Sequence, residues 1–276
     1  MTNTSIGFIG GGNMATSLIA GLIADGWQPG NIHLSEPDAK KREQLSSHYS
    51  IHTYDDSQTM ISNVTIIVLA VKPQIMAPVC KEISSSVNQY QPLVLSIAAG
   101  IQLQHLSHWL NGYTKLVRTM PNTPSMVQSG ATALFADPSV DENGKSQAET
   151  VMRAVGLSLW VSNEDELDAV TALSGSGPAY FFYIMEAMEQ AGIELGLSAD
   201  TARLLSIQTA FGAAKMALES TDAPAVLRHN VTSPGGTTER ALSIMKDRQL
   251  KQIFSEALAG ACLRSKELAE ELGQSS

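Results

Sequence analysis

A glycine-rich turn close to the start of the chain restricts the fold more than any other feature. Residues 6–9 are apolar or glycine and predict a short buried strand, and apolar positions at helical spacing follow the glycines. Between them, Gly10-x-Gly12-x-x-Ala15 fits the strand, tight turn and helix that hold a dinucleotide pyrophosphate. Asn13, at the helix start, can cap the helix or face a ligand. The simpler alternative is a glycine turn that only packs an α/β sheet.

Composition limits the classes of partner. The 276 residues suffice for one large or two ordinary domains, and the net charge of −9 argues against nucleic acid or an anionic membrane as a partner. Cys80 and Cys262 lie far apart, so we expect reduced thiols and no metal site. We find no signal peptide, and the longest apolar run, 64–71, is too short to span a bilayer. We therefore expect a cytoplasmic protein without a membrane partner.

Strand-like and helix-like segments alternate through the first half of the chain. This alternation predicts an α/β fold with a Rossmann-type dinucleotide-binding domain. The expected strands are 6–9, 31–35, 64–71, 92–97, 114–118, 131–135 and 156–161, and the expected helices are 39–47, 55–63, 103–110 and 141–153. Two prolines make 119–124 a rigid loop that we do not expect to be helical.

The end of the second strand bears on the choice of cofactor. An acidic residue there favours the free 2′-hydroxyl of NAD, whereas small polar or basic residues accommodate the 2′-phosphate of NADP. The chain offers Ser35 and Glu36 at this point, with basic residues at 40–42. Residue chemistry alone therefore leaves the preference open.

Two further strand ends carry candidate ligand contacts. Pro73 stops the strand 64–71 and holds Lys72 extended, so a cation lies where open α/β sheets bind ligands. The alternative is a solvated lysine. Ala98 and its small neighbours follow the strand 92–97 and would admit a flat ring close to the backbone.

The pattern changes at residue 162. Beyond it we find only helical periodicity, so we expect a dinucleotide-binding domain at 1–161 and an all-α domain at 162–276. Several of these helices are apolar on more than one side. A lone bundle would leave apolar surface exposed, so we expect an obligate subunit interface and a dimer.

Two glycine-bearing segments interrupt the helical half. Residues 173–178 and 231–238 each precede a helix and combine Ser or Thr with Gly and Pro. Free N–H groups at such a helix start form a nest for a carboxylate. The alternative for each segment is an ordinary helix cap.

At these blocks the chain resembles the pyrroline-5-carboxylate reductase family. The resemblance extends from residue 6 to about residue 268. The matching blocks are 10–14, 70–73, 120–124, 168–180 and 231–242. It implies hydride transfer from NAD(P)H to the C=N bond of 1-pyrroline-5-carboxylate, giving L-proline in the last step of proline synthesis. It also implies a homodimer with interlocked helical domains, often assembled into a decamer or another ring of dimers.

The resemblance and the chemistry together give a set of site residues. Thr238, whose hydroxyl can hydrogen-bond the imine nitrogen, and Lys72 are the catalytic candidates. The cofactor candidates are Gly10, Gly12, Asn13, Met14, Ser35, Val71, Lys72, Pro73, Ala98 and Asn230. The substrate candidates are Glu164, Ser176, Gly177, Val231, Gly236, Thr237 and Thr238, with backbone N–H groups of Gly236, Thr237 or Gly177 meeting the carboxylate. NADPH is the expected cofactor and NADH is possible, because Glu36 departs from the family's small or basic residue.

Two other functions fit parts of the pattern. A β-hydroxyacid dehydrogenase has the same plan and a catalytic lysine at the interdomain helix, but no lysine occurs between Lys145 and Lys215. A regulator that senses NAD(P)H without turnover would leave 231–238 without a substrate.

Overall fold

The computed structural model describes residues 4–273, which form two compact units. One contains the chain up to Ser176 together with the residues from Gly260 onward, and the other is Gly177–Ala259. The compact units divide at Ser176 and not at residue 162, because the helical turns after the last strand still pack on the sheet. The division at 161/162 marks the end of the strands and stays a prediction for the functional domains.

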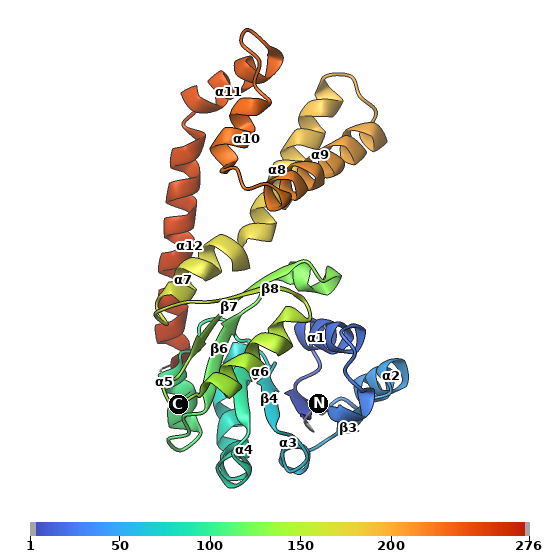
Figure 1. Cartoon of the computed structure of the whole chain (residues 1–276), viewed down its shortest axis with the longest axis vertical. Coiled ribbons are helices and arrows are strands. Elements are labelled where there is room, and N and C mark those ends of the chain that lie inside the picture. Colours follow the sequence, from blue (N-terminus) through green and yellow to red (C-terminus); the bar gives the residue numbers. More distant parts are fainter. Residues whose placement is uncertain (1–3, 274–276) are drawn as a thin grey trace. The chain divides into compact units, whose positions relative to one another are not determined.

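The first unit is built on an eight-stranded sheet (Figure 1). The strands are β1 Ile6–Ile9, β2 Ile32–Ser35, β3 His52–Tyr54, β4 Ile66–Leu69, β5 Leu93–Ser96, β6 Leu116–Met120, β7 Gly130–Ala136 and β8 Gly156–Trp160. Their order is β3-β2-β1-β4-β5-β6-β7-β8, and Ile6 lies in register with Ile32 and Ile66. β1 to β6 are parallel, whereas β7 and β8 run the opposite way. The order reverses between β1 and β4, which makes their carboxyl ends the ligand-binding position of such a sheet.

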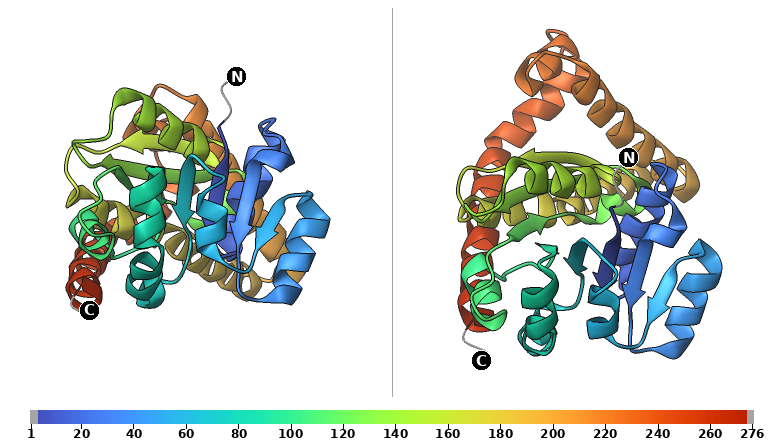
Figure 2. Two further views of the ribbon diagram at one scale, coloured as in Figure 1. Left: turned by 90° about the horizontal axis from the view of Figure 1, so that it is seen from below. Right: turned by 60° about the horizontal axis from the view of Figure 1, so that its bottom comes forward.

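Helices cover both faces of this sheet (Figure 2). Alternating strand residues point to opposite faces, so Phe8 and Val68 enter one core whereas Ile9 and Leu69 enter the other. The first core is closed by α1 Asn13–Ala24, α2 Ala39–Tyr49 and α6 Glu142–Arg153. The second is closed by α3 Ser57–Ile61, α4 Met76–Tyr90 and α5 Leu103–Trp109. The prediction of an α/β, Rossmann-type domain is confirmed.

Several local predictions need correction. Helix α4 was missed, although Met76, Cys80, Ile83 and Val87 share its buried face. Burial raises the pKa of the Cys80 thiol to about 12, so this cysteine is an unreactive core residue. The loop 119–124 was expected to contain no helix, but its last two residues begin a short 3-10 helix, Thr123–Val127. A proline occupies one of the first positions of this helix, where no N–H group is needed.

The segment 173–178 contains the start of the long helix α8 Gly177–Glu194, as expected, but it is not a free helix start. Helix α7 Glu166–Val170 continues into a π turn, Thr171–Gly175, and then into α8. The N–H of Ser176 donates to the carbonyl of Thr171 at 2.8 Å. The expected free N–H group of Ser176 is therefore used inside the helix, and the nest predicted there is not formed by this residue.

The second unit is helical throughout. α8 packs against α9 Ala199–Glu219, and small residues permit the contact, since a Cβ on Gly192 would lie 3.2 Å from that of Ala202. α10 Pro224–Asn230, α11 Thr237–Asp247 and the start of α12 Leu250–Gly273 follow. Within residues 162–273 no strand occurs, as expected. Between residues 4 and 273, no helix is both long and apolar enough to cross a membrane.

Candidate active site

All the expected cofactor residues except Asn230 gather at the carboxyl ends of parallel strands in the first unit. They follow the carboxyl ends of four adjacent strands in the order β2, β1, β4 and β5. Ser35 ends β2, the turn 10–14 follows β1, 71–73 follows β4, and Ala98 follows β5. Residues far apart in the sequence therefore meet at the point where the strand order reverses.

The glycine turn shows two different requirements for glycine. Gly10 has a φ of +96°, and a Cβ there would lie 2.9 Å from the carbonyl oxygen of Ala70. Its N–H donates to the Ser35 carbonyl at 2.8 Å, so the turn is fixed to β2 and lies against the end of β4. Gly12 has an ordinary φ of −70°, and a Cβ there would come no nearer than 4.0 Å to its closest neighbour, Ala70. Gly10 is thus required by the fold, whereas Gly12 leaves open space.

Gly12, and not Asn13, caps helix α1. No side chain bonds the N–H groups of the first turn, and Asn13 is exposed. Of the two roles open to Asn13 from the sequence, the cap is therefore wrong, and the ligand contact stays a prediction. The free N–H groups of this helix start are available to an anion.

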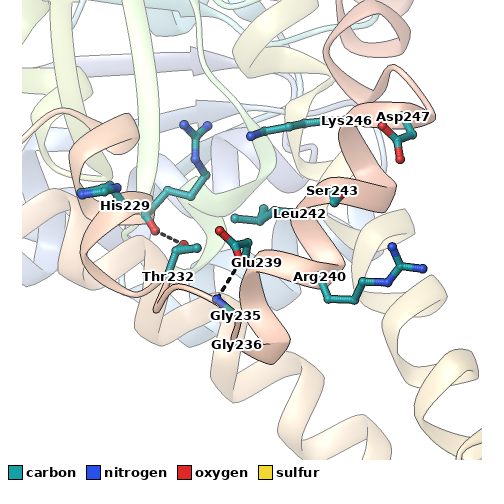
Figure 3. Close-up of a pocket in the computed structure, with 11 residues that line it drawn as sticks. His229, Thr232, Gly235, Gly236, Glu239, Arg240, Leu242, Ser243, Lys246 and Asp247 are labelled. Atoms are coloured by element: carbon teal, nitrogen blue, oxygen red, sulfur yellow. Dashed lines mark hydrogen bonds between the residues drawn. The ribbon is translucent and has the colours of Figure 1, made fainter.

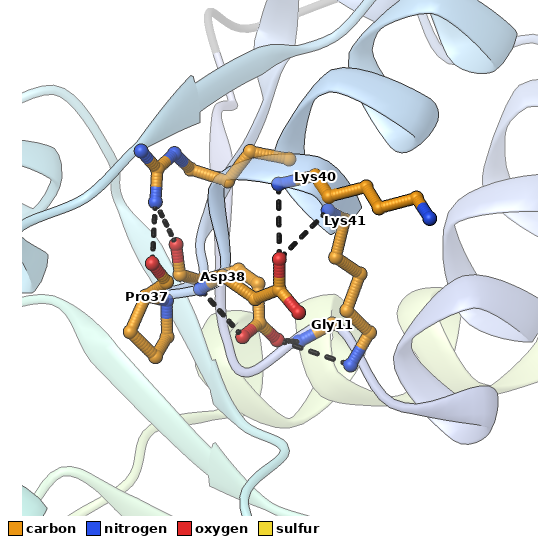
Figure 4. A network of polar contacts seen from close by, with 7 residues as sticks. Gly11, Pro37, Asp38, Lys40 and Lys41 are labelled. Carbon is orange, nitrogen blue, oxygen red and sulfur yellow. Dashed lines mark hydrogen bonds and ion pairs between the residues drawn. The ribbon is translucent and has the colours of Figure 1, made fainter.

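The carboxylate of Glu36 bonds the glycine turn. Figure 4 shows the polar network to which this contact belongs, with Gly11, Asp38 and Lys41 labelled. Its Oε2 accepts the Gly11 N–H at 2.9 Å and the Lys41 ammonium at 3.2 Å, and its Oε1 accepts the Asp38 N–H at 3.2 Å. Burial alone would raise the pKa of this carboxyl, but these three donors hold the pKa below its usual range. Glu36 is therefore an ionised, internally bonded group. The neighbouring Ser35 hydroxyl is also engaged, 2.9 Å from that of Ser57.

Lys72 has the extended backbone expected before Pro73, with φ −61° and ψ 144°. It is exposed, and no acceptor in the described part of the chain bonds its ammonium group. Both alternatives from the sequence, a ligand contact and a solvated lysine, therefore remain. Ala98 is buried at the end of β5, where its N–H faces the Ser96 hydroxyl at 3.4 Å.

Glu164 forms an ion pair that the sequence did not reveal. Its Oε1 accepts two hydrogen bonds, one from Nη1 of Arg118 at 3.0 Å and one from the N–H of Leu103 at 2.8 Å. Arg118 is only 3% exposed. The only sequence signal was an arginine at the end of an apolar strand. The substrate role of Glu164 stays a prediction beside this internal one.

The second glycine segment does begin a helix. Gly236 is the N-cap of α11, and Thr237 and Thr238 are its first two residues. The N–H of Gly236 donates to the Ser233 carbonyl at 3.0 Å, so its expected contact with the substrate carboxylate is not supported. The N–H groups of Thr237 and Thr238 have no bonded acceptor among the residues described. They keep the nest that the sequence predicted.

A cavity of about 710 Å³ adjoins this segment (Figure 3). Gly235 and Gly236 line it together with the cations Arg228, Arg240 and Lys246. Its wall also holds Glu239, whose Oε2 accepts the Gly235 N–H at 2.7 Å. Asp247 is a second carboxylate in the lining, so the positive charge is partly balanced, and Thr237 and Thr238 are not among the lining residues.

The remaining candidates precede this helix start in the sequence or lie where the chain passes from one unit to the next. Asn230 ends α10, and Val231 after it is exposed. Gly177 is the first residue of α8. Across residues 4–273, no cluster of three or more His, Cys, Asp or Glu is arranged to hold a metal ion.

A doubly wound sheet with a glycine turn at its switch point is the architecture of a dinucleotide-binding domain, here followed by a helical unit. Residues 5–100 match the family model described as NADP oxidoreductase coenzyme F420-dependent, and residues 164–268 match pyrroline-5-carboxylate reductase dimerisation. The chain belongs to the pyrroline-5-carboxylate reductase family, as the sequence resemblance implied.

Individual relatives support this assignment over the full length. The chain is 45% identical to a pyrroline-5-carboxylate reductase of Pseudomonas aeruginosa over 99% of this chain and 100% of the relative. A Pasteurella multocida reductase is 43% identical over 97% and 98%. The solved reductase of Coxiella burnetii superposes with a TM-score of 0.93 at 45% identity, covering 97% of this chain and 99% of that one. The Plasmodium falciparum enzyme, solved with NADP bound, has a TM-score of 0.85 at 27% identity, covering 98% and 99%.

Proposed function

We propose that this protein reduces the C=N bond of 1-pyrroline-5-carboxylate with hydride from NADPH and releases L-proline, the last step of proline synthesis. The full-length identity to reductases of this name is the observation that carries the proposal. It disfavours the two alternatives, a β-hydroxyacid dehydrogenase and a regulator without turnover.

The residues at the glycine turn fit a dinucleotide. Gly12 leaves space that a Cβ would fill, and the uncapped start of α1 supplies N–H groups for a pyrophosphate. We assign cofactor contacts to Gly12, Asn13 and Met14 and to the residues that end the neighbouring strands. NADPH supplies the hydride when it is bound, and the chain supplies position and hydrogen bonds.

The substrate residues are assigned to the start of α11. A carboxylate would accept the free N–H groups of Thr237 and Thr238 at a positive helix end. The Thr238 hydroxyl would donate to the imine nitrogen, because the ring carbon accepts hydride more readily when the nitrogen is hydrogen-bonded or protonated. Lys72 is the second candidate at the reacting atoms, and Glu164, Ser176, Gly177 and Val231 complete the proposed set.

The chain self-associates through its helical unit, whose family model describes dimerisation. The exposed apolar side chains of α8 support this statement, with Phe181 61% exposed beside Phe182 and Tyr183. We propose a homodimer that assembles further into a ring of dimers, such as a decamer. We propose the cytoplasm as its compartment, in keeping with two free cysteines.

A steady-state assay tests the function. Purified protein with pyrroline-5-carboxylate should oxidise NADPH and form L-proline in equal amounts, and NADH should replace NADPH with lower efficiency. Oxidation that does not depend on pyrroline-5-carboxylate, or the absence of L-proline, would refute the proposal.

A further inference from the structure

Glu36 stands where an acidic residue commonly accepts the ribose hydroxyls of NAD, directly after β2. In this chain its side chain is committed elsewhere. A carboxylate offers about four acceptor positions, and three of them are taken by Gly11, Asp38 and Lys41. The residue is only 8% exposed. Little of this carboxylate is left to meet a ribose.

The segment that carries Glu36 is itself held in place. Arg42 donates Nη1 to the carbonyls of Glu36 and Pro37 at 2.7 and 2.8 Å. Asp38 caps α2 by accepting the N–H groups of Lys40 and Lys41. The position of the carboxylate is therefore fixed by helix α2 and does not depend on a ligand.

The contact of Glu36 with Gly11 constrains the turn between β1 and α1. Three consecutive glycines lose more conformational entropy on ordering than other residues do. The Gly11 N–H is buried against Oε2 of Glu36, and a Cβ on Gly11 would lie 3.0 Å from Leu45 and 3.3 Å from that oxygen. Glu36 and Leu45 thus support the turn from the side of α2.

The charge of Glu36 is also balanced. The Lys41 ammonium lies 3.2 Å from Oε2, so the carboxylate does not present an uncompensated negative charge at the end of β2. A 2′-phosphate in this region would meet a neutral pair and not a bare carboxylate.

We propose that Glu36 is a positioning residue that holds the glycine turn ready for the pyrophosphate through the Gly11 N–H, and that it does not select NADH over NADPH through the ribose. The proposal rests on the proposed function, because it presumes that this turn binds the cofactor. On this proposal, an acidic residue directly after β2 does not prevent the chain from using NADPH.

Cofactor titrations monitored by nicotinamide fluorescence test this role, with NADPH and NADH bound separately to the full-length protein. Glu36→Ala should raise the dissociation constants of NADPH and NADH by a similar factor. We expect a factor on the order of tenfold, because one charge-assisted hydrogen bond is lost. Glu36→Gln should lose less, because its amide oxygen still accepts the Gly11 N–H. Glu43→Ala, which removes an exposed carboxylate from helix α2, should match wild type.

Two results would overturn the proposal. If either Glu36 variant binds NADPH more tightly and NADH more weakly, the residue selects the cofactor at the ribose. If both cofactors bind both variants as tightly as they bind the wild-type protein, the glycine turn binds the pyrophosphate without the hydrogen bond from Gly11 to Glu36. The split between KM and kcat separates this role from a general loss of structure: Glu36→Ala should raise the KM for NADPH more than it lowers kcat, and Glu43→Ala should keep both wild-type values. A wild-type protein that binds NADPH without reducing pyrroline-5-carboxylate would refute the proposed function, while the titrations would still decide the role of Glu36.

Discussion

Arg118 and Glu164 form an ion pair in which Nη1 of the arginine lies 3.0 Å from Oε1 of the glutamate. Arg118 belongs to β6, Glu164 follows β8, and the same carboxylate oxygen accepts the N–H of Leu103 at the start of α5. One carboxylate therefore joins three segments that are distant in the sequence. Its loss leaves a buried guanidinium and a backbone N–H without their acceptor.

The first prediction concerns this pair. Glu164→Ala should lower the free energy of unfolding by about 3 kcal/mol, because an unpaired charge is costly at a nearly buried site. Urea unfolding followed by circular dichroism measures the change. Glu166→Ala, which removes an exposed carboxylate nearby, should stay within about 0.5 kcal/mol of wild type. If Glu164→Ala unfolds like wild type and only the KM for pyrroline-5-carboxylate rises, the residue serves the substrate alone.

The second prediction separates the two glycines of the turn. Gly10→Ala should destabilise the protein by about 1–3 kcal/mol, because alanine is strained at a φ of +96°. Gly12→Val should cost less stability than Gly10→Ala, since its Cβ would meet no atom closer than 4.0 Å. It should weaken the binding of NADPH by about 5- to 150-fold through overlap with the pyrophosphate. Thermal unfolding and fluorescence titration report the two effects. Undiminished NADPH binding by Gly12→Val would contradict the assignment of this turn.

The third prediction concerns the hydroxyl at the start of α11. Thr238→Ala should lower kcat by about 10- to 1,000-fold and leave the affinity for NADPH unchanged, if the hydroxyl assists the imine nitrogen. Thr238→Ser keeps the hydroxyl and should retain most of the activity. Steady-state kinetics at saturating NADPH distinguish the two variants. Equal turnover by Thr238→Ala and wild type would remove the residue from this role.

The fourth prediction concerns self-association. Phe181→Glu should dissociate the assembly. Each copy of the substitution removes about 2 kcal/mol of stabilisation from apolar burial in the interface, and the new carboxylate must also lose its hydration there. Light scattering should report a smaller mass than for wild type at the same concentration. Gln89→Glu, at an exposed position of α4 in the other unit, serves as the control. An unchanged mass for Phe181→Glu would place the interface elsewhere.

The sequence predicted those elements whose periodicity is strong. β-Branched runs and the glycine turn identified the parallel strands, because strands buried on both faces are continuously apolar. Helix α4 was missed between two clear strands, and nothing in the residues of β7 signals its reversed direction. Strand direction depends on how the chain returns to the sheet, and local residue pattern does not encode that.

The candidate site shows a similar division. The backbone positions could be predicted, because Gly10, Gly12 and Lys72-Pro73 owe their roles to local geometry. The partners of charged side chains could not, since Glu36 and Glu164 meet residues brought close only by the fold. The π turn at Thr171–Gly175 likewise uses an N–H group that the sequence left free.

Transfer of a labelled hydride tests the central claim most directly. NADPH carrying deuterium at its transferable position should yield L-proline with one deuterium on the ring carbon that formed the C=N bond, as measured by mass spectrometry and NMR. Formation of unlabelled L-proline, or oxidation of the labelled NADPH without L-proline, would contradict the account.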